Sequence, residues 1–147
     1  MLLLIVATVA TGLFAGAAVY VSAVEHPARV GCGPELAVRE FGPSYKRGAV
    51  MQACLALVGC AAGVAAGWQR SDAPTILGAL LLGALVPFTL IVVLPTNRRL
   101  LDPTLDAQSA EAARLLGRWA RLHAVRSIVS VVAFVILLTR FRVPGAG

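Results

Sequence analysis

"RLLGRWARLHAVR" (residues 114–126) runs directly into "SIVSVVAFVILLT" (residues 127–139), and this junction decides the fold. The first stretch carries four arginines, whereas the second contains no charged residue. A helix that crosses a bilayer needs about 20 predominantly apolar residues, and cationic side chains gather where such a helix leaves the hydrocarbon. We therefore interpret residues 114–139 as part of one long helix that enters a membrane.

Three further apolar segments of comparable length precede this one. Apolar residues make up 59% of the 147 residues and charged residues only 14%, a composition that differs strongly from that of a water-soluble domain. We predict an all-α fold, a four-helix transmembrane bundle, in which residues 1–147 form a single integral membrane domain. The spans are expected at about residues 2–24, 48–68, 74–94 and 122–139.

Local signals predict where the helices end. The first helix should stop near His26, because the residue before a proline, here Pro27, is pushed out of the helical region. The third apolar segment should end near Leu94, where LPTNRR closes it. The fourth helix should begin near Ala107 or Ala110, because DPTLDAQSAE supplies turn and cap signals. That helix would then extend beyond the membrane by about two to four turns.

Lysine and arginine are distributed unequally between the two sides of the predicted membrane domain. Ten lie between spans 1 and 2 or between spans 3 and 4, and three lie on the opposite side. The ten are Arg29, Arg39, Lys46, Arg47, Arg98, Arg99, Arg114, Arg118, Arg121 and Arg126, and the three are Arg70, Arg140 and Arg142. The positive-inside rule therefore predicts two long cytoplasmic loops and both termini outside, in a plasma membrane of the bacterial type.

The net charge of +6 could also suggest a nucleic-acid partner. The basic residues flank apolar runs, however, where membrane topology accounts for them. We therefore expect the lipid bilayer, and no nucleic acid, as the partner of these cations.

Glycines recur at helical spacing in two of the predicted spans. Gly12 and Gly16 form one GxxxG pair, and Gly59, Gly63 and Gly67 continue the same spacing over three turns. Small residues at this spacing let membrane helices approach closely. We expect these glycines to lie where the helices of the bundle contact one another.

Polar residues gather near the predicted cytoplasmic ends of all four spans, where they are candidates for function because burying them in a membrane is costly. On the fourth helix, at about 100° per residue, Trp119, His123 and Arg126 share one face within about 60°. The predicted inward-facing residues are these three, and the predicted outward-facing residues on the opposite side are Arg114, Arg118 and Arg121.

Four short motifs carry a family resemblance. They are EHP closing span 1, FGPSYKR opening span 2, PTNRRL after span 3 and RWARLHAVR on the fourth helix. In this order they resemble the anthrone oxygenase-like family of small four-span membrane proteins over nearly the whole chain. The resemblance implies an oxidoreductase that oxidises polycyclic anthrones to anthraquinones with O₂ and without a recognised cofactor. A lipophilic aromatic molecule and O₂ are the partners that it implies.

Such a reaction needs a base, a partner for the enolate oxygen and an apolar cavity. A histidine titrates near neutrality, so His26 or His123 is the expected base and the other a second acid or base. Arg126 and Asn97 are expected to stabilise the enolate oxygen, and Trp119 to form a flat wall for an aromatic substrate. The further residues expected to bind substrate are Glu25, Tyr45 and Gln52.

Two other classes of function are open at this point. His26, His123 and either Glu25 or Asn97 could form a two-histidine, one-oxygen site for iron or copper, although their spacing is not that of a recognised metal motif. Alternatively, the bundle binds or moves a lipophilic small molecule without catalysis, or serves as a structural partner in a membrane complex.

Overall fold

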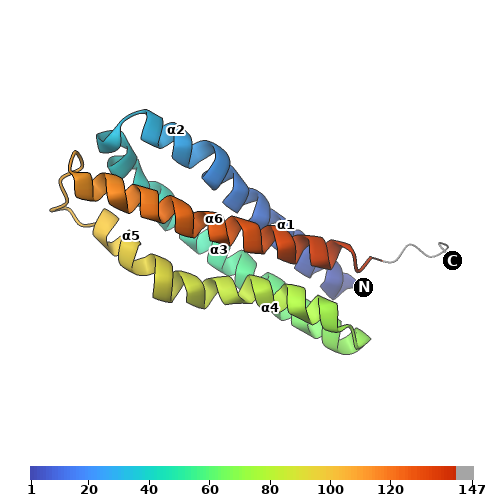
Figure 1. The fold of residues 1–147 in the computed structure, drawn as a ribbon. Helices are drawn as coiled ribbons and strands as arrows, with labels where there is room; N and C mark the ends of the chain where they lie inside the picture. The colour runs from blue at the N-terminus through green and yellow to red at the C-terminus, as the bar shows by residue number, and fades with distance from the viewer. Residues whose placement is uncertain (142–147) are drawn as a thin grey trace.

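The computed structural model describes residues 1–141, so Arg142, which entered the topology count, lies outside the described residues. The described residues contain helices and turns but no strand. Four long helical rods lie side by side (Figure 1), and each is long and apolar enough to cross a membrane. They comprise Leu2–Gly31, Pro34–Arg70, Ala73–Leu100 and Ala110–Leu138. The prediction of an all-α, four-helix integral membrane protein is confirmed.

The first rod continues through Pro27, so the predicted stop near His26 is wrong. It consists of α1 (Leu2–Tyr20), the π-helical segment η1 (Val21–Glu25) and α2 (His26–Gly31). The His26 N–H bonds to the Val21 carbonyl, five residues back. The wider π turn gives the proline ring room where a regular α turn would clash with it.

The third rod uses the same arrangement. It consists of α4 (Ala73–Phe88), the π-helical segment η2 (Thr89–Val93) and α5 (Leu94–Leu100). The Leu94 N–H bonds to the Thr89 carbonyl, and Pro95 follows directly. The helix therefore continues beyond Leu94, where the apolar run ends, because the π turn again carries it past a proline.

The segment between spans 1 and 2 is helical, so the predicted long loop there is wrong as well. Only Cys32 and Gly33 separate α2 from α3 (Pro34–Arg70). Gly33 has a φ of 102°, a conformation that glycine adopts without a steric penalty. Pro34 then begins α3 with the φ that a first helical turn requires. The first and second rods therefore form a helical hairpin, whose turn consists of Cys32 and Gly33.

The fourth rod, α6 (Ala110–Leu138), begins at Ala110 as predicted. The Ser109 hydroxyl caps it by accepting a hydrogen bond from the Ala112 N–H at 3.1 Å. At about 1.5 Å per residue, its 29 residues extend about 43 Å, which exceeds the roughly 30 Å of a hydrocarbon core. The length of α6 agrees with a helix that extends beyond the membrane.

Glycines determine how closely α3 packs against its neighbours. A Cβ at Gly63 would lie 2.6 Å from the Ala79 Cβ, and Gly59 and Gly67 have similarly tight contacts. The prediction for this glycine series is confirmed. A Cβ at Gly12 would meet the Phe134 ring, whereas one at Gly16 would meet no atom of the described residues within 4 Å, so the prediction for Gly16 is wrong.

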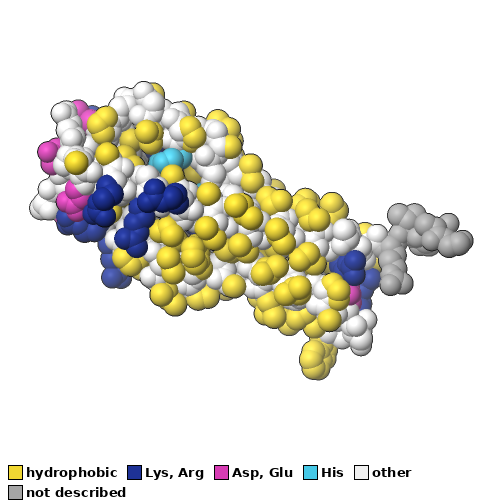
Figure 2. All heavy atoms as spheres, viewed as in Figure 1, with side chains coloured by type: hydrophobic (Ala, Val, Ile, Leu, Met, Phe, Trp, Pro, Cys, Tyr) yellow, Lys and Arg dark blue, Asp and Glu magenta, His cyan; other side chains and the backbone are white. Residues whose placement is uncertain are grey.

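The outer surface has the pattern of a protein surrounded by acyl chains. In Figure 2, hydrophobic side chains cover the middle of the molecule, while Lys and Arg gather at its two ends, most densely at the end that carries α2 and α5. Large apolar side chains such as Leu13, Val50 and Ile91 are exposed on the outer surface. In water such a surface would favour aggregation, whereas in a bilayer it faces lipid.

The glycine packing predicts a difference in stability between two matched variants. Gly63→Val should destabilise the bundle by about 1–3 kcal/mol, because the added side chain overlaps α4. Gly16→Val should leave stability almost unchanged, because its position is open. Thermal unfolding followed by circular dichroism in detergent measures both, and equal losses of stability would contradict this packing.

Candidate active site

A cavity of about 180 Å³ is lined by residues from all four rods. Six of the eight predicted site residues line it, namely Tyr45, Gln52, Asn97, Trp119, His123 and Arg126. His26 and Glu25 are not among the lining residues. The structure therefore brings most of the predicted residues to one place, although they come from positions as far apart as α3 and α6.

The arginines of α6 divide as the helical angles predicted. Trp119 and His123 are buried and Arg126 is half-buried at the cavity wall. On the opposite side of the helix, three arginines are exposed. These are Arg114, Arg118 and Arg121. The predicted inward and outward faces of this helix are confirmed.

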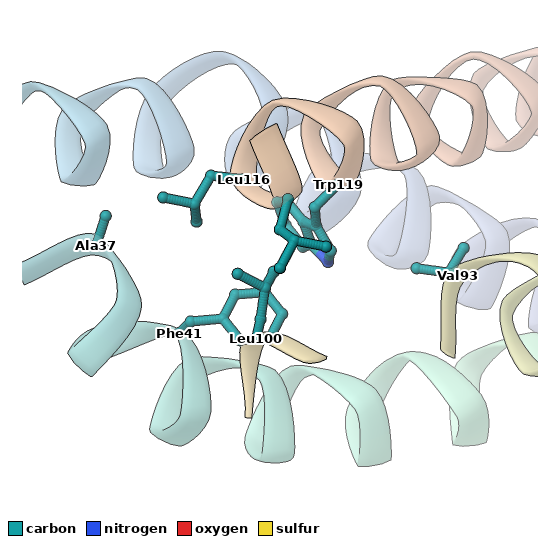
Figure 3. Close-up of a cluster of buried hydrophobic side chains, with 7 residues drawn as sticks. Ala37, Phe41, Val93, Leu100, Leu116 and Trp119 are labelled. Atoms are coloured by element: carbon teal, nitrogen blue, oxygen red, sulfur yellow. The ribbon is translucent and has the colours of Figure 1, made fainter. Parts of the chain in front are cut away.

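Aromatic rings form one wall of the cavity. The Trp119 ring stacks on His123 with centroids 4.6 Å apart, and Phe41 meets Trp119 edge to face at 5.5 Å. Phe41 also stacks on Tyr45 at 5.7 Å. Figure 3 shows Phe41 and Trp119 within the hydrophobic cluster between α3, α5 and α6. Sequence analysis identified Trp119 but missed Phe41, although FGPSYKR begins with it.

The two histidines occupy different positions relative to the cavity. His123 lines it, and the His123 Nδ1 lies 2.9 Å from the Ser22 hydroxyl oxygen. His26 is buried against Trp119, with ring centroids 5.0 Å apart, and does not line the cavity. The His26 Nδ1 is buried without a hydrogen-bond partner among the described residues. Direct contact with a molecule in the cavity is therefore open to His123 and not to His26.

Arg126 is held by neutral groups. Its Nη2 donates a hydrogen bond to the Gln52 side-chain oxygen at 2.5 Å, and its guanidinium lies 5.5 Å from the Phe14 ring centroid. No carboxylate of the described residues lies within 4.0 Å of it. A cation inside an apolar bundle is unfavourable without a counter-charge. The charge of Arg126 is therefore not neutralised by any carboxylate of the described residues.

Asn97 adds a second polar group to the cavity wall. It is almost fully buried at 1% exposure, and its side-chain oxygen has no hydrogen-bond partner among the described residues. An unpaired buried amide is costly. Because Asn97 lines the cavity, a ligand that donates a hydrogen bond could satisfy this oxygen.

Arg29 is a buried residue that sequence analysis counted only as a topology signal. Its guanidinium pairs with the Glu25 carboxylate, lies 2.9 Å from a Glu40 carboxylate oxygen and donates to the Ser44 hydroxyl at 3.2 Å. Ser44 in turn donates to Glu25 at 2.7 Å. This network joins α2 to α3. The four-residue spacing of Glu25 and Arg29 would have indicated their pairing had the first helix been predicted to continue.

The candidate metal ligands do not come together. The Glu25 carboxylate is engaged by Arg29 and Ser44. Among residues 1–141, no three His, Cys, Asp or Glu side chains are placed to hold a metal ion. The form of the metal alternative that uses His26, His123 and Glu25 is therefore not assembled in this structure.

Comparison with known proteins identifies the family. The family model described as anthrone oxygenase matches residues 41–136. The chain belongs to the anthrone oxygenase family. The matched segment includes all six of the predicted residues that line the cavity, so the resemblance inferred from the motifs is confirmed.

A curated relative supports the same family. Anthrone oxygenase tpcL of Aspergillus fumigatus is 41% identical over 69 residues, which cover 45% of this chain and 43% of the fungal protein. The match thus spans less than half of that relative. No solved structure matches the chain. Membership of the anthrone oxygenase family supports an oxygenase-like function in general.

The Arg29 network predicts a difference between two arginines of the same helical hairpin. Arg29→Met should destabilise the protein by about 3 kcal/mol, because it leaves carboxylates near the bundle without their cation. Arg39→Met should cost less than about 1 kcal/mol, because its pair with Glu35 is exposed. Thermal unfolding in detergent separates the two, and an equal cost would show that the network does not stabilise the hairpin.

Proposed function

We propose that the chain oxidises a lipophilic polycyclic phenol or anthrone with O₂ inside this cavity. The single observation that carries the proposal is that Arg126, a cation with no carboxylate partner among residues 1–141, lines the same largely apolar cavity as His123. A base and a cation placed together fit a substrate that loses a proton and becomes an oxyanion. Membership of the anthrone oxygenase family names the chemical class of that substrate.

The walls and the mouth of the cavity support a flat, lipophilic substrate. Phe41, Tyr45 and Trp119 offer ring faces and edges against which a polycyclic aromatic molecule can stack. Among the lining residues, only Ala53 of α3 and Leu90 of η2 are exposed at the outer surface. Both lie in apolar stretches, so the mouth between them would face lipid. A substrate dissolved in the bilayer would reach the cavity by this route.

The reaction begins with a proton transfer. The CH₂ group of an anthrone lies between two aromatic rings and opposite a carbonyl, so its proton is acidic. His123 takes this proton, and the electron pair of the C–H bond is delocalised onto the carbonyl oxygen. The Arg126 guanidinium and the N–H of the Asn97 side-chain amide donate hydrogen bonds to the resulting oxyanion, an interaction that is strong in a site with few competing waters.

The oxygen chemistry then proceeds from the anion. The anthrolate transfers one electron to O₂, and the two radicals combine to form a C–O bond. His123 returns its proton to give the hydroperoxide. Removal of the second proton from the same carbon breaks the O–O bond, so that a carbonyl forms and water leaves. One oxygen atom of O₂ enters the quinone, and the other becomes water.

Two choices that the sequence left open, and the topology that it predicted, are part of the proposal. His123 rather than His26 is the base, because only His123 lines the cavity. The substrate itself supplies the electrons to O₂, so no cofactor is required. The cation-rich end of the molecule, with α2 and α5, faces the cytoplasm and both termini lie outside, as the positive-inside rule predicts.

Oxygen uptake by membranes supplied with anthrone tests the proposal. His123→Ala should lower the rate about 10²–10⁴-fold, because the base is lost. Arg126→Met should lower it about 10²–10³-fold, because the oxyanion loses its partner. Two controls are expected to stay within about tenfold of the parent. These are His26→Ala, because His26 does not line the cavity, and Arg118→Met, because Arg118 is exposed.

Three results would contradict the proposal. Uptake that survives in His123→Ala but disappears in His26→Ala would reverse the assignment of the base. Binding of anthrone without oxygen uptake in the parent protein would favour a non-enzymatic carrier. Stoichiometric iron or copper in the purified, active protein would favour the metal-dependent alternative, so metal content is measured on the same sample.

A further inference from the structure

A chain of hydroxyl groups runs from His123 to the backbone of α1. The Ser22 hydroxyl, in η1, lies 2.9 Å from the His123 Nδ1 and 2.8 Å from the Ser127 hydroxyl. The Ser127 hydroxyl lies 2.9 Å from the Ala18 carbonyl oxygen. Ser127 is buried and Ser22 half-buried, so these groups depend on one another for hydrogen bonds. Neither serine was a candidate in the sequence analysis.

The direction of these hydrogen bonds follows from counting protons. Each hydroxyl has one proton to donate. If Ser127 donates to the Ala18 carbonyl, it can only accept from Ser22, and Ser22 can then only accept from the N–H of His123. This direction makes all three hydrogen bonds. In the opposite direction, Ser127 donates to Ser22 and Ser22 donates to the imidazole, which makes only two.

The favoured direction determines the tautomer of His123. Its proton is on Nδ1, which is turned toward Ser22, a residue that does not line the cavity. The other ring nitrogen, Nε2, then carries the free lone pair, and it makes no hydrogen bond with any described residue. A histidine that accepts a proton needs this lone pair on the side of the substrate.

We infer that Ser22 and Ser127 are positioning residues, which hold neutral His123 as the Nδ1–H tautomer and leave Nε2 as the base of the cavity. The tautomer itself follows from the hydrogen bonds alone, whereas its use in catalysis rests on the proposed function. Ser22 belongs to the same π segment that carries the first rod past Pro27. The irregular turn thus has a chemical use in addition to its structural one.

Nitrogen NMR on the ¹⁵N-histidine-labelled protein in lipid bilayers tests the tautomer directly. The chain has two histidines, so in the His26→Gln variant every histidine signal comes from His123. At a pH where His123 is neutral, the parent of this series should show a protonated Nδ1 and an unprotonated Nε2. Adding Ser22→Ala should introduce the Nε2–H form, and Ser22→Thr, which keeps a hydroxyl, should restore the Nδ1–H form.

A matched control is available on the same helix. Ser130 is buried and donates to the Ser127 carbonyl at 2.9 Å, but it makes no hydrogen bond with the His123 ring. Ser130→Ala should therefore leave the tautomer unchanged. If Ser22→Ala does not fold, Ser127→Ala provides the second test, because loss of the acceptor for Ser22 should also mix the tautomers.

Oxygen uptake separates this inference from the proposed function. Ser22→Ala should lower kcat at least tenfold with little change in KM, because it alters the base and not the binding of substrate. An Nε2–H tautomer in the parent, or an unchanged tautomer in Ser22→Ala, would overturn the inference. The predicted tautomer in a protein without oxygen uptake would support the inference while contradicting the proposed function.

Discussion

A guanidinium inside an apolar bundle must be compensated, and Arg126 is compensated only by neutral groups. Gln52 accepts one of its hydrogen bonds, and the face of Phe14 lies beside it. These contacts hold the side chain without neutralising its charge. A carboxylate in this position would complete a structural salt bridge and remove the reason for a ligand to bind. The absence of such a carboxylate among the described residues leaves the positive charge available to the cavity.

The cavity around Arg126 depends on two rods of similar construction. In each, a π segment is followed by one residue and then by a proline, Pro27 in the first rod and Pro95 in the third. The helix continues past the proline, so the residue two positions later still faces the bundle. These residues are Arg29 and Asn97, and both line the cavity. The irregular turns thus allow polar groups to enter a site within apolar helices, a common use of π segments.

Long, regular periodicity was the most reliable guide from the sequence. The inward face of α6, with Trp119, His123 and Arg126, could be predicted because that helix has regular geometry over 29 residues. The outward arginines followed from the same angles. The glycine spacing in α3 was equally informative, since its helix is continuous, whereas Gly16 showed that spacing alone does not establish a contact.

Features that depend on irregular turns or on packing between rods could not be predicted. The proline rule stopped the first helix too early, because sequence gives no clear signal for a π turn that accommodates the ring. Because the first helix was stopped at His26, Arg29 was assigned to a loop. Phe41 was overlooked because it precedes the apolar run of the second span, in a segment that was not predicted to be helical. The choice between His26 and His123 depends on where Trp119 lies relative to both, which only the packing of α2 against α6 determines.

The central claim is that the cavity stabilises its substrate as an oxyanion beside Arg126. The most direct measurement is the absorption spectrum of anthrone mixed with the protein in lipid vesicles at neutral pH without oxygen. The band of the anthrolate anion should appear and should rise to a plateau as protein is added, and it should be lost in Arg126→Met. Anthrone that stays neutral when bound, or an anion band that is unchanged in Arg126→Met, would show that Arg126 does not stabilise an oxyanion.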